Sequence, residues 1–408
     1  MEEDWKTYKL GDLIEINTNT IKKGQTKWIH YIDIKSVGSG TYVDPKRIQF
    51  DDAPSRARRL LLEGDTVISS VRPNLKSYFY SQNLKNFTIA STGFAVLSPR
   101  KIDSRFLYYL TTNDRYIDFL VKSCTGSAYP AFGPNVIVES EVTIPRSLPE
   151  QHAIASILSA LDDKIELNLQ MNKTLEEMAM ILYKHWFVDF GPFRDGEFVS
   201  SELGEIPKGW EVKTIGELYK TTSGGTPSRK KLEFYQSGNI PWVKSKELYE
   251  NYVIDTEEKI TQAGLDSSSA KLIPSKSILL AMYGATVGES SILAIEATCN
   301  QAICAIIQKN ISYLYAFLFL RFNKNDILNQ AVGSAQQNIS QEIIKGIKMI
   351  SPPPDLIFFA ELETYFNLMH NNTIENATLS NLRNTLLPKL ISGEVRVKDA
   401  ALTIAEVL

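Results

Sequence analysis

The sequence predicts an α/β protein: two similar domains of mixed short strands and helices, joined and spaced by two long antiparallel coiled-coil helices. Two observations carry this prediction. A heptad seam occurs twice in the sequence, about half the chain apart, and the sequence that begins the first domain also occurs a second time. The charge supports them, because the domain segments are basic and the helices acidic. Together these features indicate an internal pseudo-twofold repeat in the order domain, helix, domain, helix.

The first seam alternates steps of three and four residues, which is typical of a long helix packed along one partner. Its members are Leu158, Leu161, Ile165, Asn168, Asn172, Leu175, Ala179, Leu182 and Trp186. A shift of 204 residues gives the second seam, from which only Arg383 departs: Leu362, Tyr365, Met369, Asn372, Asn376, Leu379, Leu386 and Leu390. Asparagine fills the same two slots in both. We therefore expect the helices to pair antiparallel and to meet near Asn172 and Asn376, the central slots.

The segments follow in order. The first domain is predicted at residues 1–149, with short strands, a helix at Phe106–Val121 and a last strand at Val136–Ile144. A helix at 150–190 and a Gly- and Pro-rich linker at 191–209 come next. The second domain is predicted at 210–352, a second helix at 353–392 and a C-terminal tail at 393–408. Trp210–Leu218 echoes Trp5–Leu13, so the two domains should share a fold.

The composition of the chain bounds its class. Its 408 residues are 43% hydrophobic, enough for more than one folded core. Three cysteines are too few for a disulfide framework, and four scattered histidines offer no metal-ligand spacing. The acidic start lacks an apolar signal region, and no apolar run reaches membrane-spanning length, so we expect a cytoplasmic protein without a membrane segment.

Charge is distributed unevenly along the chain. The net charge of −3 divides into +4 for residues 1–149, −7 for 150–207, +3 for 208–350 and −3 for 351–408. This pattern favours two polyanion-binding domains on an acidic scaffold.

The inventory of catalytic motifs is poor. Gly224–Lys230 is Gly-rich and basic but is not a Walker A loop. Pro352–Pro354 lacks the flanking residues of an amino-methyltransferase loop. Glu257 and Lys259 form only a short nuclease-like Glu-x-Lys. We therefore predict no catalytic residues and no metal site, and interpret the chain as a non-catalytic binding subunit.

Several stretches resemble type I restriction–modification specificity subunits. They are Pro149–Gln151 with the helix after it, Trp186–Phe190, Glu205–Trp210, Gly224–Ser228 with Ile240–Val243, and Leu386–Gly393. The resemblance covers nearly the whole chain. It implies that each domain is a target recognition domain that reads one half of an asymmetric bipartite site in double-stranded DNA, and that the helices space the domains.

The resemblance also implies partners. Two methyltransferase subunits would dock on the helices and methylate adenine with S-adenosylmethionine. Two restriction subunits would add cleavage that depends on ATP and Mg²⁺. No cofactor is expected in this chain. Two alternatives stay open from the residues: a stand-alone DNA-binding regulator, and a nuclease that uses Glu257 and Lys259.

Candidate DNA contacts are basic clusters and polar loops, because phosphate contacts supply affinity and base edges supply specificity. In the first domain they are Arg56, Arg58, Arg59, Arg72, Lys76, Ser127 and Tyr129. In the second they are Thr226, Ser228, Arg229, Lys230, Lys231, Lys244, Lys246, Ser334, Gln336, Gln337 and Asn338.

Overall fold

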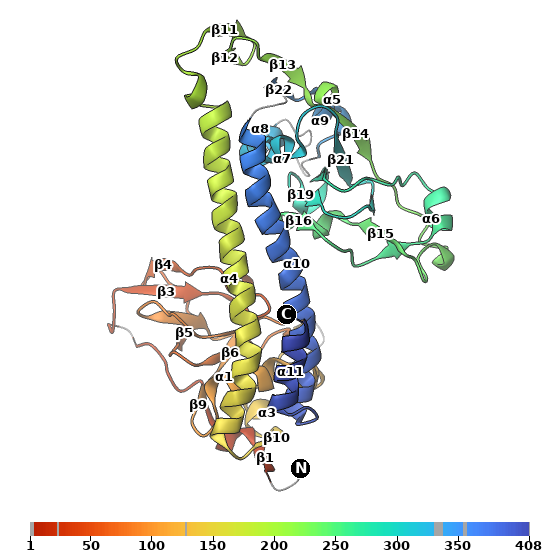
Figure 1. Cartoon of the computed structure of the whole chain (residues 1–408). Coiled ribbons are helices and arrows are strands. Elements are labelled where there is room, and N and C mark those ends of the chain that lie inside the picture. The colour runs from red at the N-terminus through yellow and green to blue at the C-terminus, as the bar shows by residue number, and fades with distance from the viewer. Residues whose placement is uncertain (1–3, 23, 127–128, 330–337, 354–356, 408) are drawn as a thin grey trace. The chain divides into compact units, whose positions relative to one another are not determined.

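The computed structural model describes residues 4–22, 24–126, 129–329, 338–353 and 357–407 (Figure 1). The chain divides into two compact units. The first unit joins Met1–Ile165 to Thr378–Leu408, and the second unit is Glu166–Ala377. Among the described residues, no helix has both the length and the apolar character needed to cross a membrane.

The described residues of the first unit form ten strands, and the first of these strands pairs with the last. The strands are β1 (Trp5–Lys9), β2 (Ile14–Ile16), β3 (Trp28–Ile32), β4 (Lys46–Gln49), β5 (Ala57–Leu60), β6 (Thr66–Ser69), β7 (Tyr78–Tyr80), β8 (Thr88–Ser91), β9 (Phe94–Pro99) and β10 (Glu141–Pro145). β1 pairs antiparallel with β10. Two four-stranded sheets follow the orders β2-β9-β6-β7 and β4-β3-β8-β5, and β3 and β8 are parallel.

The helix predicted at Phe106–Val121 is two helices, α1 (Ser104–Thr112) and α2 (Asp114–Lys122). Asn113 separates them because its backbone is extended and its side chain accepts the Tyr116 N–H as the cap of α2. The strand predicted from Val136 is also wrong at its start. Pro134–Val138 forms α3, with proline in the first turn, and the strand begins only at Glu141.

The second unit repeats this plan. Its strands are β11 (Phe198–Ser201), β12 (Gly204–Pro207), β13 (Glu211–Thr214), β14 (Tyr219–Ser223), β15 (Ile240–Val243), β16 (Tyr252–Val253), β17 (Lys259–Ile260), β18 (Ser277–Ala281), β19 (Ser290–Leu293), β20 (Thr298–Cys299), β21 (Ile303–Gln308) and β22 (Lys348–Ser351). β13 pairs with β22 as β1 does with β10. The sheet β14-β21-β18-β19-β16 matches β2-β9-β6-β7, with β16 added at its edge. The set β17-β15-β20 matches β4-β3-β8, including the parallel pair.

The short helices of the second unit follow the same order. They are α5 (Ile215–Leu218), α6 (Gln262–Asp266), α7 (Tyr313–Phe322), α8 (Lys324–Asn329) and α9 (Gln341–Gly346). α7, α8 and α9 occupy the sequence positions that α1, α2 and α3 have in the first unit. The segment predicted as a linker contains the β11–β12 hairpin, and Ile206 and Trp210 are buried in the core of the second unit.

Each of the two long helices, α4 (Leu148–Phe187) and α10 (Ile357–Ser392), is divided between the two units, with one part of the helix in each unit. In the first unit Leu158 and Leu161 share a buried cluster with Leu379 and Leu386, and Ile165 packs against it. In the second unit Leu175 shares a cluster with Leu362 and Met369, and Leu182 packs against it. The apolar seam positions are therefore core positions, as predicted. α10 continues through Pro388.

Asparagines continue the seam within the second unit. Asn168 Nδ2 donates to Oδ1 of Asn376 over 2.9 Å, and Asn372 Nδ2 donates to Oδ1 of Asn172 over 2.8 Å. The prediction that the helices meet at these asparagines is confirmed. The partners are shifted by one helical turn from the expected Asn172–Asn376 pair, because the pseudo-twofold relation passes between the two slots and not through one of them.

The segment predicted as a C-terminal tail contains a further helix, α11 (Val397–Val407). Ala400 is fully buried in the core of the first unit, and Val397 and Ile404 pack against that core. The end of the chain is thus part of the first unit.

Candidate nucleic-acid interface

The Gly-rich segment of the second unit is hydrogen-bonded to a buried tryptophan. Nε1 of Trp242 donates to the carbonyl of Gly225 over 2.9 Å, and the Gly225 N–H donates to the carbonyl of Cys299 over 2.9 Å. The next residue, Thr226, is exposed, and its hydroxyl donates to Oε1 of Gln301. Trp242 is therefore a core residue, and the polar and basic side chains from Ser228 onward lie at the surface.

Arg229 is the most constrained of the basic residues in this segment. Its guanidinium lies 4.4 Å from the ring centre of Tyr235 and 4.8 Å from that of Trp242. Nη1 donates to Oε2 of Glu258 over 2.6 Å. The two rings fix the plane of the cation, and the carboxylate balances its charge. Its neighbours Ser228, Lys230 and Lys231 are exposed, and Lys231 lies over the ring of Phe234 at 4.9 Å.

Lys244 and Lys246 belong to the same charge network. Nζ of Lys244 donates to Glu257 and to Glu258, each over 2.8 Å, and Lys246 lies 2.7 Å from Glu257. Hydrogen bonds from Lys244 and Lys246 lower the pKa of Glu257 to about 2. The hydrogen bond from Arg229 and that from Lys244 lower the pKa of Glu258. Three cations thus face two carboxylates that stay ionised at neutral pH.

The three arginines near β5 do not form one cationic patch. Arg56 is exposed and binds Oδ2 of Asp33 over 2.5 Å and the Tyr31 hydroxyl over 3.1 Å. Arg58 and Arg59 are partly buried and donate to the carbonyls of Ala57 and Asn17. Burial also lowers the pKa of Arg59. Of the three, Arg56 is the one that presents its charge at the surface.

Arg72, Lys76 and Tyr129 come together in the first unit. The Arg72 guanidinium lies 4.5 Å from the ring centre of Tyr129, a residue that is 70% exposed. Nζ of Lys76 donates to Oδ1 of Asp114 at the start of α2 over 2.7 Å. The Arg72 N–H donates to the carbonyl of Pro130 over 2.8 Å, so the turn that carries both cations is tied to the segment after residue 128.

Some predicted contacts lie outside the described residues. They are Ser127, Ser334, Gln336 and Gln337. Asn338 is described and exposed, and the next residue, Ile339, is buried and donates its N–H to the carbonyl of Met282 over 2.9 Å.

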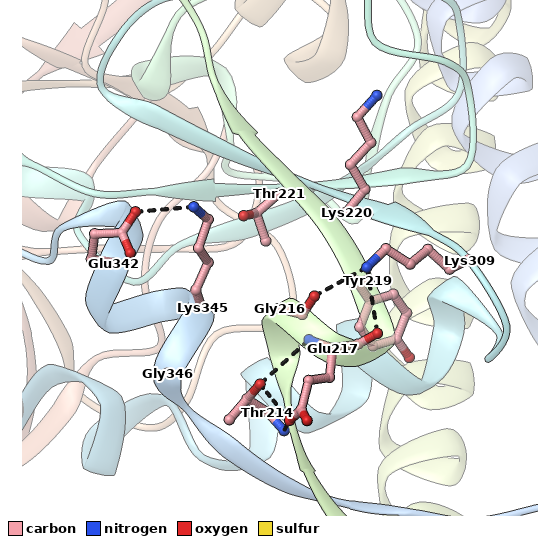
Figure 2. A pocket seen from close by; sticks show the side chains of 10 residues that line it. All are labelled: Thr214, Gly216, Glu217, Tyr219, Lys220, Thr221, Lys309, Glu342, Lys345 and Gly346. Carbon is pink, nitrogen blue, oxygen red and sulfur yellow. Dashed lines mark hydrogen bonds and ion pairs between the residues drawn. The ribbon is translucent and has the colours of Figure 1, made fainter.

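A shallow hollow of about 560 Å³ lies between α5 and α9 in the second unit (Figure 2). Its polar groups already serve the fold. The carboxylate of Glu217 accepts hydrogen bonds from the N–H and the hydroxyl of Thr214 and so caps α5. Both hydrogen bonds lower the pKa of Glu217, and the bond from the backbone N–H has the larger effect. Nζ of Lys309 donates to the carbonyls of Gly216 and Glu217. The hollow therefore has no arrangement that points to acid–base chemistry.

The nuclease alternative finds no support in the geometry. Glu257 binds Lys244 and Lys246, whereas Lys259 lies 3.4 Å from Asp255. Over the ranges that the structure covers, no three His, Cys, Asp or Glu side chains form a group that could hold a metal ion. The residues that sequence reasoning missed are the acids that hold the cations, Asp33 and the pair Glu257–Glu258. They would be found by counting the opposite charges on neighbouring strands, and not only those within one segment of the sequence.

Comparison with known proteins gives one consistent result. Residues 2–177 and 207–377 match the family described as the type I restriction modification DNA specificity domain. The MjaIX specificity subunit of Methanocaldococcus jannaschii is 28% identical over 97% of this chain and 95% of its own length. The HindI specificity subunit of Haemophilus influenzae is 26% identical over 96% of this chain and all of its own length.

A solved structure has a similar fold. It is the S subunit of a type I restriction–modification system from M. genitalium, with a TM-score of 0.58, 15% identity, and coverage of 96% of this chain and 97% of that one. Two α/β domains with long helices packed together are thus the architecture of both proteins.

Proposed function

The chain belongs to the type I restriction modification DNA specificity family, and from that membership we propose that it is the DNA-recognition subunit of a type I restriction–modification complex. Each of its two domains is a target recognition domain that reads one half of a bipartite site in double-stranded DNA. The chain itself carries out no catalysis and binds no cofactor. S-adenosylmethionine, ATP and Mg²⁺ belong to its methyltransferase and restriction partners.

The observation that carries this proposal is the repetition of one strand plan with unlike surfaces. β6 and β7 correspond to β18 and β19, and β3 and β8 correspond to β15 and β20. The second unit has an Arg229-centred network of cations and carboxylates beside β15, while the first unit has Arg56 paired with Asp33 beside β3. Because equivalent frames carry different side chains, the two half-sites should differ in sequence.

A row of exposed apolar side chains on α4 supports the docking of partner subunits. Leu167, Met171, Met178 and Ile181 follow a heptad spacing on a face away from the seam, and Ile181 is 70% exposed. Thr174 occupies the missing slot. An apolar row of this kind in an otherwise acidic helix is typical of a surface that a partner helix covers. We assign this row to the methyltransferase subunits.

The function is tested by co-expression with the methyltransferase subunit of the same system. We expect the two to co-purify, and sequencing of methylated adenines in such cells should give an interrupted motif with two unlike halves. Failure to co-purify, together with specific DNA binding by the chain alone, would support a stand-alone regulator. A palindromic motif would contradict unlike domain surfaces.

The docking row has a matched test. The variant M178E/I181E changes the net charge by −2 on the apolar row, and K173E makes the same change on another face of α4. We expect the first variant to lose the methyltransferase and the second to keep it, at equal thermal stability. Retention of the partner by M178E/I181E would exclude the row as the docking surface.

A further inference from the structure

One five-residue turn is built the same way in both units. In the first unit it joins β6 to β7. Its two end residues, Arg72 and Lys76, have left-handed backbones, with φ of 49° and 52°. The Leu75 N–H donates to the carbonyl of Arg72 over 2.9 Å, and the Phe132 N–H donates to the carbonyl of Ser70 over 3.1 Å.

A shift of 212 residues gives the same turn between β18 and β19. Its end residues are Gly284 and Gly288, with φ of 78° and 81°. The Val287 N–H donates to the carbonyl of Gly284 over 3.2 Å, and the Ile339 N–H donates to the carbonyl of Met282 over 2.9 Å. Each bond has its counterpart in the first unit, so the two turns are equivalent by geometry as well as by order.

The residues at the left-handed positions differ in a meaningful way. Glycine adopts a positive φ without steric strain, whereas residues with a Cβ are strained there. The turn of the second unit, with glycine at both positions, is therefore free of this backbone strain. The first unit keeps an arginine and a lysine at the same two positions, although glycine satisfies the fold. Strain that the fold does not require points to a role for the side chains.

The charge of the turn differs between the units in the same sense. Residues 69–77 carry two positive charges, whereas residues 281–289 carry one negative charge, that of Glu289. Each turn is tied to the start of the helix beside it, with the signs exchanged. Lys76 binds Asp114 of α2 over 2.7 Å, and Glu289 accepts from Lys324 of α8 over 2.7 Å. The anchoring is thus common to both units, and the excess positive charge is particular to the first.

We propose that the turn from Arg72 to Lys76 is a DNA-backbone anchor of the first unit that has no side-chain equivalent in the second. This inference rests on the proposed function. The exposed ring of Tyr129 holds the Arg72 guanidinium in place before DNA arrives, which reduces the entropy lost on binding a phosphate. Lys76 supplies a second cation, and its partner Asp114 is well exposed. The two recognition domains then hold the duplex unequally.

The test uses the full chain in complex with its methyltransferase, and a mixed-sequence DNA duplex as the probe. The variant R72G/K76G installs the residues that the second unit has, so it should fold. We expect an unchanged or higher melting temperature and weaker DNA binding. The slope of log affinity against log salt should become shallower by roughly 0.9 for each phosphate that the variant no longer neutralises. The control R100Q/K101Q removes the same charge from an exposed bend of the first unit and should keep the wild-type slope.

Two binding results would overturn the anchor: R72G/K76G binding with the wild-type affinity and slope, or a slope change no larger than that of R100Q/K101Q. A clearly lower melting temperature of R72G/K76G would also overturn it, because the side chains would then serve the fold. If the wild-type complex itself failed to bind DNA, the proposed function would fall, and the anchor with it.

Discussion

Asn372 donates a hydrogen bond from Nδ2 to Oδ1 of Asn172 over 2.8 Å, inside the helix pair of the second unit. The neighbouring pair, Asn168 with Asn376, has the same arrangement. The internal repeat relates Asn168 to Asn372 and Asn172 to Asn376, so it converts one hydrogen-bonded pair into the other. Two polar pairs inside an apolar seam select one alignment of the helices over those shifted by a heptad.

The Asn172–Asn372 pair gives a stability prediction. The single variant N372L leaves the Asn172 amide without its partner in a mostly apolar seam and should destabilise the protein by about 1–3 kcal/mol. The double variant N172L/N372L should recover stability beyond the single variant, because two leucines replace two polar groups. Denaturant unfolding of the four members of this cycle measures the coupling. A double variant less stable than N372L would contradict this account.

The Arg383–Asp162 pair gives a second prediction. Arg383 occupies a seam slot of α10, and its Nη1 donates to Oδ1 of Asp162 over 2.6 Å, while Tyr109 donates its hydroxyl to Oδ2 over 2.7 Å. Replacing Arg383 by Leu leaves a partly buried carboxylate without its cation, and should cost about 1–3 kcal/mol. The double variant R383L/D162N should recover part of the loss. Equal stability of R383L and wild type would show that the pair is solvated.

The carboxylates of the second unit should restrain DNA binding. In the variant E257Q/E258Q, Arg229, Lys244 and Lys246 lose their ionic partners and become available to phosphate. We expect tighter binding to mixed-sequence duplex and a steeper salt slope, with reduced preference for the methylated motif. A salt titration of the complex measures both. Weaker binding by E257Q/E258Q would indicate that the acids position the cations for DNA.

The same network gives a pH prediction. The pKa of Glu257 is lowered to about 2, below that of an unfolded glutamate. A lowered folded-state pKa contributes stability above the unfolded value and loses it as pH falls toward the folded value. Between about pH 5 and pH 8 we therefore expect Glu257 to stay ionised and the restraint on DNA binding to stay constant. Comparing the affinities of wild type and E257Q across this range tests it, and a ratio that changes with pH would contradict it.

The sequence predicted the repeated architecture because periodicity and repetition survive in the residue pattern. It missed the break at Asn113, because an asparagine cap between two helices with continuous apolar spacing leaves that spacing intact. It also read Arg383 as a departure from the seam, since its partner Asp162 lies 221 residues away. The candidate contacts were harder. The carboxylate that binds Arg229 is that of Glu258, 29 residues further along the chain. No local sequence pattern predicts a pair at that separation.

The first unit is built from two distant segments of the chain, and this affects the order in which the two units can fold. Residues 1–165 leave the ribosome first, yet the seam partners of Leu158 and Leu161 are Leu379 and Leu386, near the end of the chain. The second unit is one continuous segment and can fold while the first still waits for its last helices. We expect a released chain that ends at Ala377 to show a protease-resistant fragment from the second unit, while the beginning of α4 is still cleaved. The half of the protein that is made first is therefore the half that is finished last.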